Sequence, residues 1–283
     1  GRLLTDILSH QGFTSQKGQS RHQLWLRLCD IISQHPECSR GLRVEAILRQ
    51  GLSSFKDQTG RLWTALASFF IRNGNYEKAR DVLEEALGSV TSEQDFAHIW
   101  DVYADFEDRL LADYISFRSN SSASSEEKEE EEKEFALRVE RYKYLLDRRP
   151  LLLSSVKLRR NPHNVKEWMK RVKLYSNARA VVDTYSRAIR TVDPLIATGK
   201  PHLLWAQFAA FYGQQNDDEN ARKIFERGTE AVFRTPAELA SMWAEYIEFE
   251  LKRGDFDRAR ALLARALRVP SPSSFGALKE SDW

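Results

Sequence analysis

Six of the seven tryptophans recur at a nearly constant interval. They are Trp25, Trp63, Trp100, Trp168, Trp205 and Trp243. The successive differences in their sequence numbers are 38, 37, 68, 37 and 38. A fixed period of this size indicates a chain of stacked supersecondary units rather than one globular core. Because the long interval from Trp100 to Trp168 is nearly twice the others, the spacing predicts six repeats with one insertion in the third.

The sequence after each tryptophan predicts an amphipathic helix. Four residue types recur at identical offsets in two repeats: Trp100, Tyr103, Phe106 and Glu107, and then Trp243, Tyr246, Phe249 and Glu250. Side chains at offsets of three, six and seven lie on one helical face. We interpret the aromatic stripe as a packing surface, in preference to a ligand or cofactor site.

A second helix is predicted to follow each first one, with a small residue at a fixed place. Ala86, Gly228 and Ala266 all lie at the same offset, +23, from the tryptophan of their own repeat. Small side chains let two helices approach closely. Gly74 and Gly254 mark the turn in two repeats, where glycine supplies the left-handed conformation that ends a helix.

The pattern therefore predicts an all-α fold, an α-solenoid of about six TPR-like helix-turn-helix repeats. The expected pairs are 22–34 with 43–54, 61–72 with 76–88, 95–113 with 134–147, 164–175 with 178–191, 202–213 with 218–231, and 238–252 with 255–268. The fourth repeat departs from the pattern, because Arg171 replaces the aromatic residue and the small residue Ala188 lies at offset +20 from Trp168. We expect a tighter or bent turn there.

The predicted organisation has four parts. Residues 1–115 hold repeats 1 and 2 and the first helix of repeat 3, residues 116–134 form an acidic insertion, residues 135–268 complete the repeats, and residues 269–283 form a linker or tail. The insertion is expected to be disordered or to extend a charged helix. Docking to a basic partner, or phosphorylation at Ser124 or Ser125, is an alternative role.

Charge and composition exclude some classes of protein. The net charge is +2, but Glu126 to Glu134 contributes −5, so the remaining chain carries +7. This balance does not specify a partner. No apolar run is long enough for a membrane span. Two cysteines, Cys29 and Cys38, favour a reducing compartment, with Cys29 as a buried thiol. The chain begins at Gly1, and we expect it to be part of a longer protein.

No catalytic, metal or cofactor motif is found, so we predict a protein that is not an enzyme. Gly199-Lys200 lacks the upstream glycine of a phosphate-binding loop, and Pro201 follows it. The histidines do not pair with cysteine or acidic residues at metal-ligand spacing.

One cluster of basic residues is the candidate contact patch. Its members are Arg148, Arg149, Lys157, Arg159 and Arg160. A solvated basic face is one interpretation. Binding to an RNA backbone or to an acidic partner is the other, and RNA bound through phosphates would dissociate with rising salt.

The motifs resemble those of half-a-TPR (HAT) repeats. The helix pattern Trp-x-x-Tyr-x-x-Phe-Glu is followed by Ala-Arg-x-x-Phe-Glu-Arg, which reads Ala221 to Arg227 here. Three longer stretches, Phe55 to Leu87, Arg148 to Trp168 and Thr191 to Trp205, resemble the central region of SYF-type pre-mRNA splicing factors, the family that includes XPA-binding protein. Leu195 and Ile196 depart from that family, in which a more polar pair is expected.

This resemblance implies a nuclear scaffold without a cofactor, small-molecule substrate or membrane. Its implied partners are splicing proteins of the Prp19-associated complex, with pre-mRNA intron or small nuclear RNA as a further possibility. It also implies, as alternatives, direct binding of RNA backbone and a scaffold role in transcription-coupled DNA repair.

Overall fold

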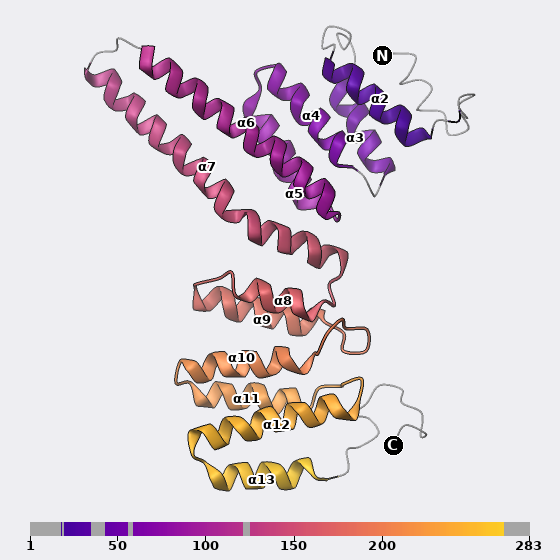
Figure 1. The fold of residues 1–283 in the computed structure, drawn as a ribbon, viewed down its shortest axis with the longest axis vertical. Helices are drawn as coiled ribbons and strands as arrows, with labels where there is room; N and C mark the ends of the chain where they lie inside the picture. The colour runs from indigo at the N-terminus through magenta and orange to yellow at the C-terminus, as the bar shows by residue number, and fades with distance from the viewer. Residues whose placement is uncertain (1–17, 19, 35–42, 56–58, 121–124, 269–283) are drawn as a thin grey trace. The chain divides into compact units, whose positions relative to one another are not determined.

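The fold of the described residues is all-α. A computed structural model describes residue 18 and residues 20–34, 43–55, 59–120 and 125–268. Within these ranges the only β-structure is an isolated bridge between Asn164 and Thr198. The chain divides into two compact units, residues 1–160 and 161–283. Each unit is a stack of helical hairpins (Figure 1), as the tryptophan spacing predicts.

The helices agree with the predicted pairs except around the insertion and in the fourth repeat. In the first unit they are α2 (Arg21–Gln34), α3 (Val44–Ser54), α4 (Gly60–Arg72), α5 (Tyr76–Ser89), α6 (Glu93–Asn120) and α7 (Ser125–Arg160). In the second unit they are α8 (Val165–Val172), α9 (Ala178–Thr191), α10 (His202–Gln214), α11 (Asp218–Thr229), α12 (Pro236–Arg253) and α13 (Phe256–Ala266). Cys38, Ser124 and the predicted tail, residues 269–283, lie outside the described residues.

The predicted end of the helix at residue 147 was wrong, because α7 continues through Pro150 to Arg160. A proline inside a helix removes one hydrogen bond and costs about 3 kcal/mol. Apolar side chains on both sides of Pro150 offset that cost: Leu145 and Val156 are buried, and Leu152 and Leu153 pack against the same core. Tertiary packing therefore overrides the local signal to end the helix.

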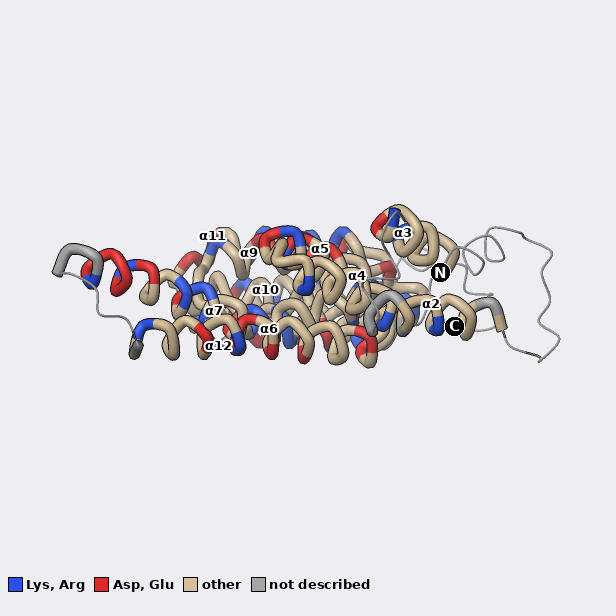
Figure 2. The backbone as a smooth tube through the Cα atoms, turned by 90° about the horizontal axis from the view of Figure 1, so that it is seen from above, with Lys and Arg blue, Asp and Glu red and all other residues tan. Residues whose placement is uncertain are grey.

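The described part of the acidic insertion is helical. It lengthens α6 to Asn120 and starts α7 at Ser125. The acidic residues at the start of α7 are visible as red turns in Figure 2. The Tyr114 hydroxyl donates to the Glu131 carbonyl at 3.2 Å, and the Arg138 guanidinium lies 4.5 Å from the centre of the Tyr114 ring. These contacts hold the two long helices together.

Four of the six repeat tryptophans are buried, and two are only partly buried. Trp25, Trp63, Trp100 and Trp168 are between 2% and 7% exposed. Trp205 and Trp243 are partly exposed, and both pack against the core of the second unit. Guanidinium groups cover them: Arg227 lies 5.9 Å from the Trp205 ring and Arg265 lies 5.2 Å from the Trp243 ring.

The fixed small residue lies where neighbouring helices meet. Ala86 is 0% exposed, and Ala266 is partly buried. A Cβ atom added to Gly228 would lie 2.6 Å from the Met242 Cε atom and 3.2 Å from the Trp205 Cβ atom. Position 228 therefore faces both its own hairpin and the next one, which explains the constant spacing.

The turn between the two helices uses one backbone conformation in three repeats. Gly74, Asn216 and Gly254 have positive φ angles of 72°, 59° and 78°, and all three lie at offset +11 from the tryptophan of their repeat. Asparagine tolerates this left-handed region better than most residues. In the fourth repeat α8 instead ends at Val172, and the next three amides bond three residues back, as in a tightened helical turn.

Two copies of one polar network connect successive hairpins, one copy in each unit. We call it the polar clamp. The first copy consists of Arg80, Glu84, Tyr103, Glu107 and Arg148, and the second of Arg222, Glu226, Tyr246, Glu250 and Arg265.

The second copy shows the geometry. Arg222 on α11 donates to both carboxylate oxygens of Glu250 on α12, at 2.7 and 2.9 Å, and Glu250 is fully buried. The Tyr246 hydroxyl donates to Glu226 at 3.2 Å, and Arg265 on α13 donates to Glu226 twice at 2.9 Å. The Arg265 hydrogen bonds lower the pKa of Glu226, whereas burial raises the pKa of Tyr246.

The first copy repeats this arrangement. Arg80 pairs with Glu107 at 2.6 and 3.1 Å, the Tyr103 hydroxyl donates to Glu84 at 3.3 Å, and Arg148 pairs with Glu84 at 2.8 and 2.9 Å. A buried carboxylate is stable only when a cation and hydrogen bonds compensate it. The clamp therefore fixes the register in which one hairpin stacks on the next.

Replacing Gly228, which lies on α11 against both α10 and α12, should destabilise the second unit. We expect Gly228→Val to reduce the free energy of unfolding by about 1–3 kcal/mol, because the added carbons overlap Met242 and Trp205. Urea unfolding followed by circular dichroism measures the change. Gly88→Ala is the control, because nothing lies within 4 Å of its added Cβ. An unchanged midpoint for Gly228→Val would refute the close contact.

Neutralising the buried carboxylate should loosen the same unit. We expect Glu250→Ala to cost about 2–3 kcal/mol, because Arg222 loses two charge-assisted hydrogen bonds. Glu248→Ala, at a nearby position on α12, removes only an exposed pair with Lys252 and should leave the free energy of unfolding nearly unchanged. The same urea titration distinguishes them, and equal losses for the two variants would contradict the clamp.

Candidate functional site

The predicted basic patch is largely occupied by contacts within the first unit. Arg148 belongs to the polar clamp, and Lys157 lies 3.4 Å from Glu93. Arg149 lies 5.9 Å from the Trp100 ring centre, and Arg160 is exposed. These positions do not present five available cations to one ligand.

Arg159 has a structural role at the end of α5. Its guanidinium donates to the carbonyls of Leu87, Gly88 and Val90 at 2.6–3.0 Å. The last carbonyls of a helix lack partners within the helix, so a cation stabilises them. Burial lowers the pKa of Arg159. Arg159 thus attaches the end of α7 to the end of α5.

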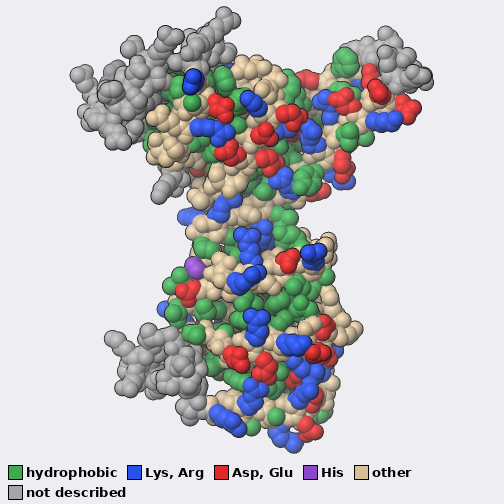
Figure 3. Space-filling view, turned by 180° about the vertical axis from the view of Figure 1, so that it is seen from behind, with side chains coloured by type: hydrophobic (Ala, Val, Ile, Leu, Met, Phe, Trp, Pro, Cys, Tyr) green, Lys and Arg blue, Asp and Glu red, His purple; other side chains and the backbone are tan. Residues whose placement is uncertain are grey.

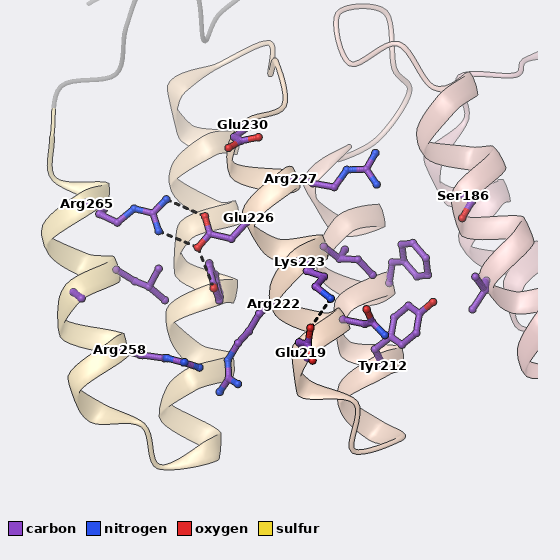
Figure 4. Close-up of a pocket in the computed structure, with 17 residues that line it drawn as sticks. Ser186, Tyr212, Glu219, Arg222, Lys223, Glu226, Arg227, Glu230, Arg258 and Arg265 are labelled. Carbon is purple, nitrogen blue, oxygen red and sulfur yellow. Dashed lines mark hydrogen bonds and ion pairs between the residues drawn. The ribbon is translucent and has the colours of Figure 1, made fainter.

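A groove of about 1000 Å³ lies in the second unit, on the face formed by the second helix of each hairpin. Its described lining residues come from α9, α10, α11, α12 and α13 (Figure 4). They are Val182, Ser186, Phe208, Tyr212, Glu219, Asn220, Arg222, Lys223, Ile224, Glu226, Arg227, Glu230, Tyr246, Arg258, Ala261, Leu262 and Arg265.

Side-chain caps define where the three outer helices of the groove begin. Asn177, Asp217 and Asp255 precede α9, α11 and α13, and each side chain accepts a hydrogen bond from a backbone amide in the first turn. Such caps satisfy amides that otherwise lack partners. Polar residues in the sequence therefore set the ends of the helices whose faces form the groove.

The groove has an apolar floor. Phe208 on α10 is 7% exposed and stacks on Tyr185 with ring centres 5.0 Å apart. Tyr212 contacts Phe208 at 5.4 Å between ring centres. Val182 and Leu262 add aliphatic surface from α9 and α13. An apolar floor with a polar rim is the usual composition of a binding site.

The groove rim carries charges of both signs. The polar clamp accounts for Arg222, Glu226 and Arg265, and Lys223 pairs with the exposed Glu219 at 2.6 Å. Figure 3 views this unit from the side of α9 and α11, where basic, acidic and apolar side chains alternate. Arg227 contacts the Trp205 ring and has no carboxylate partner among the described residues.

Glu226, one of the carboxylates that line the groove, is held by Arg265 and Tyr246, so it is not placed as a free base. In the part of the chain that the structure describes, no group of three or more histidines, cysteines or acidic residues is arranged to hold a metal ion. Every helix in those ranges is too short or too polar to span a bilayer.

The loops within two of the stretches quoted above for their family resemblance, residues 161–164 and 192–201, pair with each other. Thr198 donates its amide to the His163 carbonyl at 2.9 Å, and its carbonyl accepts from the Val165 amide at 3.1 Å. The Asp193 amide donates to His163 Nδ1 at 3.0 Å. Gly199 lies in this loop with φ +114°, and Leu195 and Ile196 are 42% and 60% exposed.

Sequence reasoning missed the groove and most of the clamp. Arg80 and Arg222 share the offset +17 from a repeat tryptophan, and Glu84 and Glu226 share the offset +21. Comparing polar residues at equal offsets would have found these four. The groove itself combines residues from three hairpins, and no local spacing indicates it.

Comparison with known proteins agrees with the repeat architecture. A family model described as the pre-mRNA-splicing factor SYF1 middle HAT repeat matches residues 1–192. A second, the Syf1/CRNKL1 C-terminal HAT repeat, matches residues 194–282. The two matches together extend over both units.

Individual curated relatives indicate the same family as these two models. Pre-mRNA-splicing factor SYF1 of Homo sapiens is 43% identical over 269 residues, covering 95% of this chain and 31% of the relative. The syf1 homolog of Drosophila melanogaster is 44% identical over 268 residues, 94% of this chain and 30% of the relative. Pre-mRNA-splicing factor cwf3 of Schizosaccharomyces pombe is 36% identical over 281 residues, which cover 99% of this chain and 35% of the relative.

The chain spans about a third of the length of these curated relatives. The stacked hairpins, the repeated clamp and the two family matches lead to one conclusion: this chain belongs to the SYF1 family of HAT-repeat pre-mRNA-splicing factors.

Proposed function

We propose that this chain is a non-enzymatic, protein-binding scaffold in pre-mRNA splicing, acting in the nucleus. Its partners are protein components of the Prp19-associated spliceosomal machinery. The observation that carries the proposal is the groove over α9, α11 and α13, which belongs to a chain whose relatives are named splicing factors. An apolar floor rimmed by paired charges fits a protein surface.

Two features support a scaffold. In the second unit a buried polar pair fixes the α10–α11 hairpin to the α12–α13 hairpin, so this part of the groove is preformed and loses little conformational entropy when a partner binds. Repeat proteins use the extended face of their stacked helices as a binding surface. Binding to a preformed groove requires no chemical step.

The geometry favours protein over RNA as the direct ligand. RNA backbone is bound by several cations that are available to phosphates. Of the five predicted contacts, Arg148, Lys157 and Arg159 form ion pairs or hydrogen bonds with other parts of the first unit. In the second unit, carboxylates alternate with the cations of the groove.

Affinity purification tests the proposal. The native protein is tagged, purified from nuclear extract with and without nuclease, and its partners are identified by mass spectrometry. We expect Prp19-associated splicing proteins to be retained after nuclease treatment, because protein contacts hold them. Absence of splicing proteins, or their complete release by nuclease, would contradict a protein-binding scaffold.

An RNA titration tests the alternative ligand. We expect Arg160→Glu to leave the affinity of the 283-residue chain for single-stranded RNA unchanged. Arg160 is exposed and is not part of the polar clamp, so its reversal should not disturb the clamp. Arg109→Glu, at an exposed pair on α6, is the matched control. A large loss of RNA affinity for Arg160→Glu alone would restore the basic patch as an RNA contact.

A further inference from the structure

The part of the groove between α9 and α11 differs from the rest of it. We call it the α9–α11 furrow. Its lining residues are Val182, Ser186, Phe208, Tyr212, Lys223 and Arg227. Figure 4 shows Ser186 on α9 opposite Lys223 and Arg227 on α11. Between α11 and α13, by contrast, the clamp pairs Arg265 with Glu226.

The furrow can accept an apolar side chain. Val182 and Phe208 form adjoining apolar surface, and the half-buried Tyr212 ring extends it along α10. Covering such surface with an aliphatic or aromatic group removes apolar area from water and so contributes to the binding free energy. This surface supplies affinity but does not select charge.

Two cations beside the furrow lack an acidic partner within the described residues. Arg227 is exposed and contacts only the Trp205 ring among its described contacts. Arg190 is exposed and lies one helical turn after Ser186, on the same side of α9. Its Nε atom donates to the Ser186 carbonyl at 3.1 Å, which leaves the two terminal nitrogens of the guanidinium available. A guanidinium binds a carboxylate through two parallel hydrogen bonds.

The surrounding charges favour a peptide over a nucleic acid. Glu219 and Glu230 also line the groove, and they would repel a continuous phosphate backbone. A peptide can place one or two carboxylates at the cations and apolar side chains elsewhere. Spaced charges of both signs therefore favour a peptide whose charged and apolar side chains are spaced to match them.

On this basis we infer that the α9–α11 furrow binds a partner segment that carries acidic side chains next to an aliphatic or aromatic anchor. Its carboxylates meet Arg190 and Arg227, and its anchor rests on Val182, Phe208 and Tyr212. This inference rests on the proposed protein-scaffold function and specifies the chemistry of one partner.

Selection from a displayed library of short random peptides tests the inference on the full chain. We expect the selected peptides to be enriched in Asp and Glu beside Leu, Ile, Phe or Trp. The double variant Arg190→Glu, Arg227→Glu should bind synthetic versions at least about fivefold more weakly, because attraction becomes repulsion. Arg260→Glu on α13 is the control, because Arg260 is exposed and lies outside the groove lining.

The outcomes separate this inference from the scaffold proposal. Enrichment of basic or uncharged peptides, or equal binding by the double variant with an unchanged circular dichroism spectrum, would overturn the acidic specificity but leave a protein scaffold. A labelled single-stranded RNA is tested in parallel. Binding of RNA with no selected peptide would contradict both. Loss of binding in the Arg260→Glu control would show that general charge, and not the furrow, selects the peptides.

Discussion

The stacking of this protein depends on a carboxylate that is buried between two hairpins. Glu250 on α12 is fully buried, and Arg222 on the preceding hairpin supplies its charge partner. A buried charge without a partner is costly, so a stacking register that separated the two would be strongly disfavoured. Glu107 and Arg80 impose the same condition in the first unit. Apolar burial drives the hairpins together, and the clamp selects one alignment.

The fixed alignment of the hairpins shapes the groove on the surface of the second unit. The helices α9, α11 and α13 lie side by side, each packed on the first helix of its own hairpin. Their outer faces therefore form one groove, and aromatic side chains from α10 and α12 form its floor. Most charged groups in it satisfy one another within the unit. The few that do not, such as Arg227, are then available to a ligand. In the proposed function, binding specificity follows from charges that are not paired within the stacked helices.

Particular residues show how far sequence reasoning reaches. The tryptophan interval and the position of Gly228 located the hairpins, because both reflect packing within a short segment. The predicted helix end before Pro150 was wrong, because distant apolar contacts hold α7 together. The contact patch around Arg159 stays a prediction, but the sequence did not show that Arg159 also binds the end of α5. The groove residues could not be predicted, since they come from separate hairpins.

The sequence by itself determined the repeat unit, the all-α class and the family resemblance, because these depend on side chains at fixed offsets along one chain. Only the tertiary structure decided which charges are neutralised and which remain available. Arg222 and Arg227 lie close together on one helix, yet one meets a buried carboxylate and the other faces a furrow. That difference depends on what the neighbouring hairpin places opposite each residue.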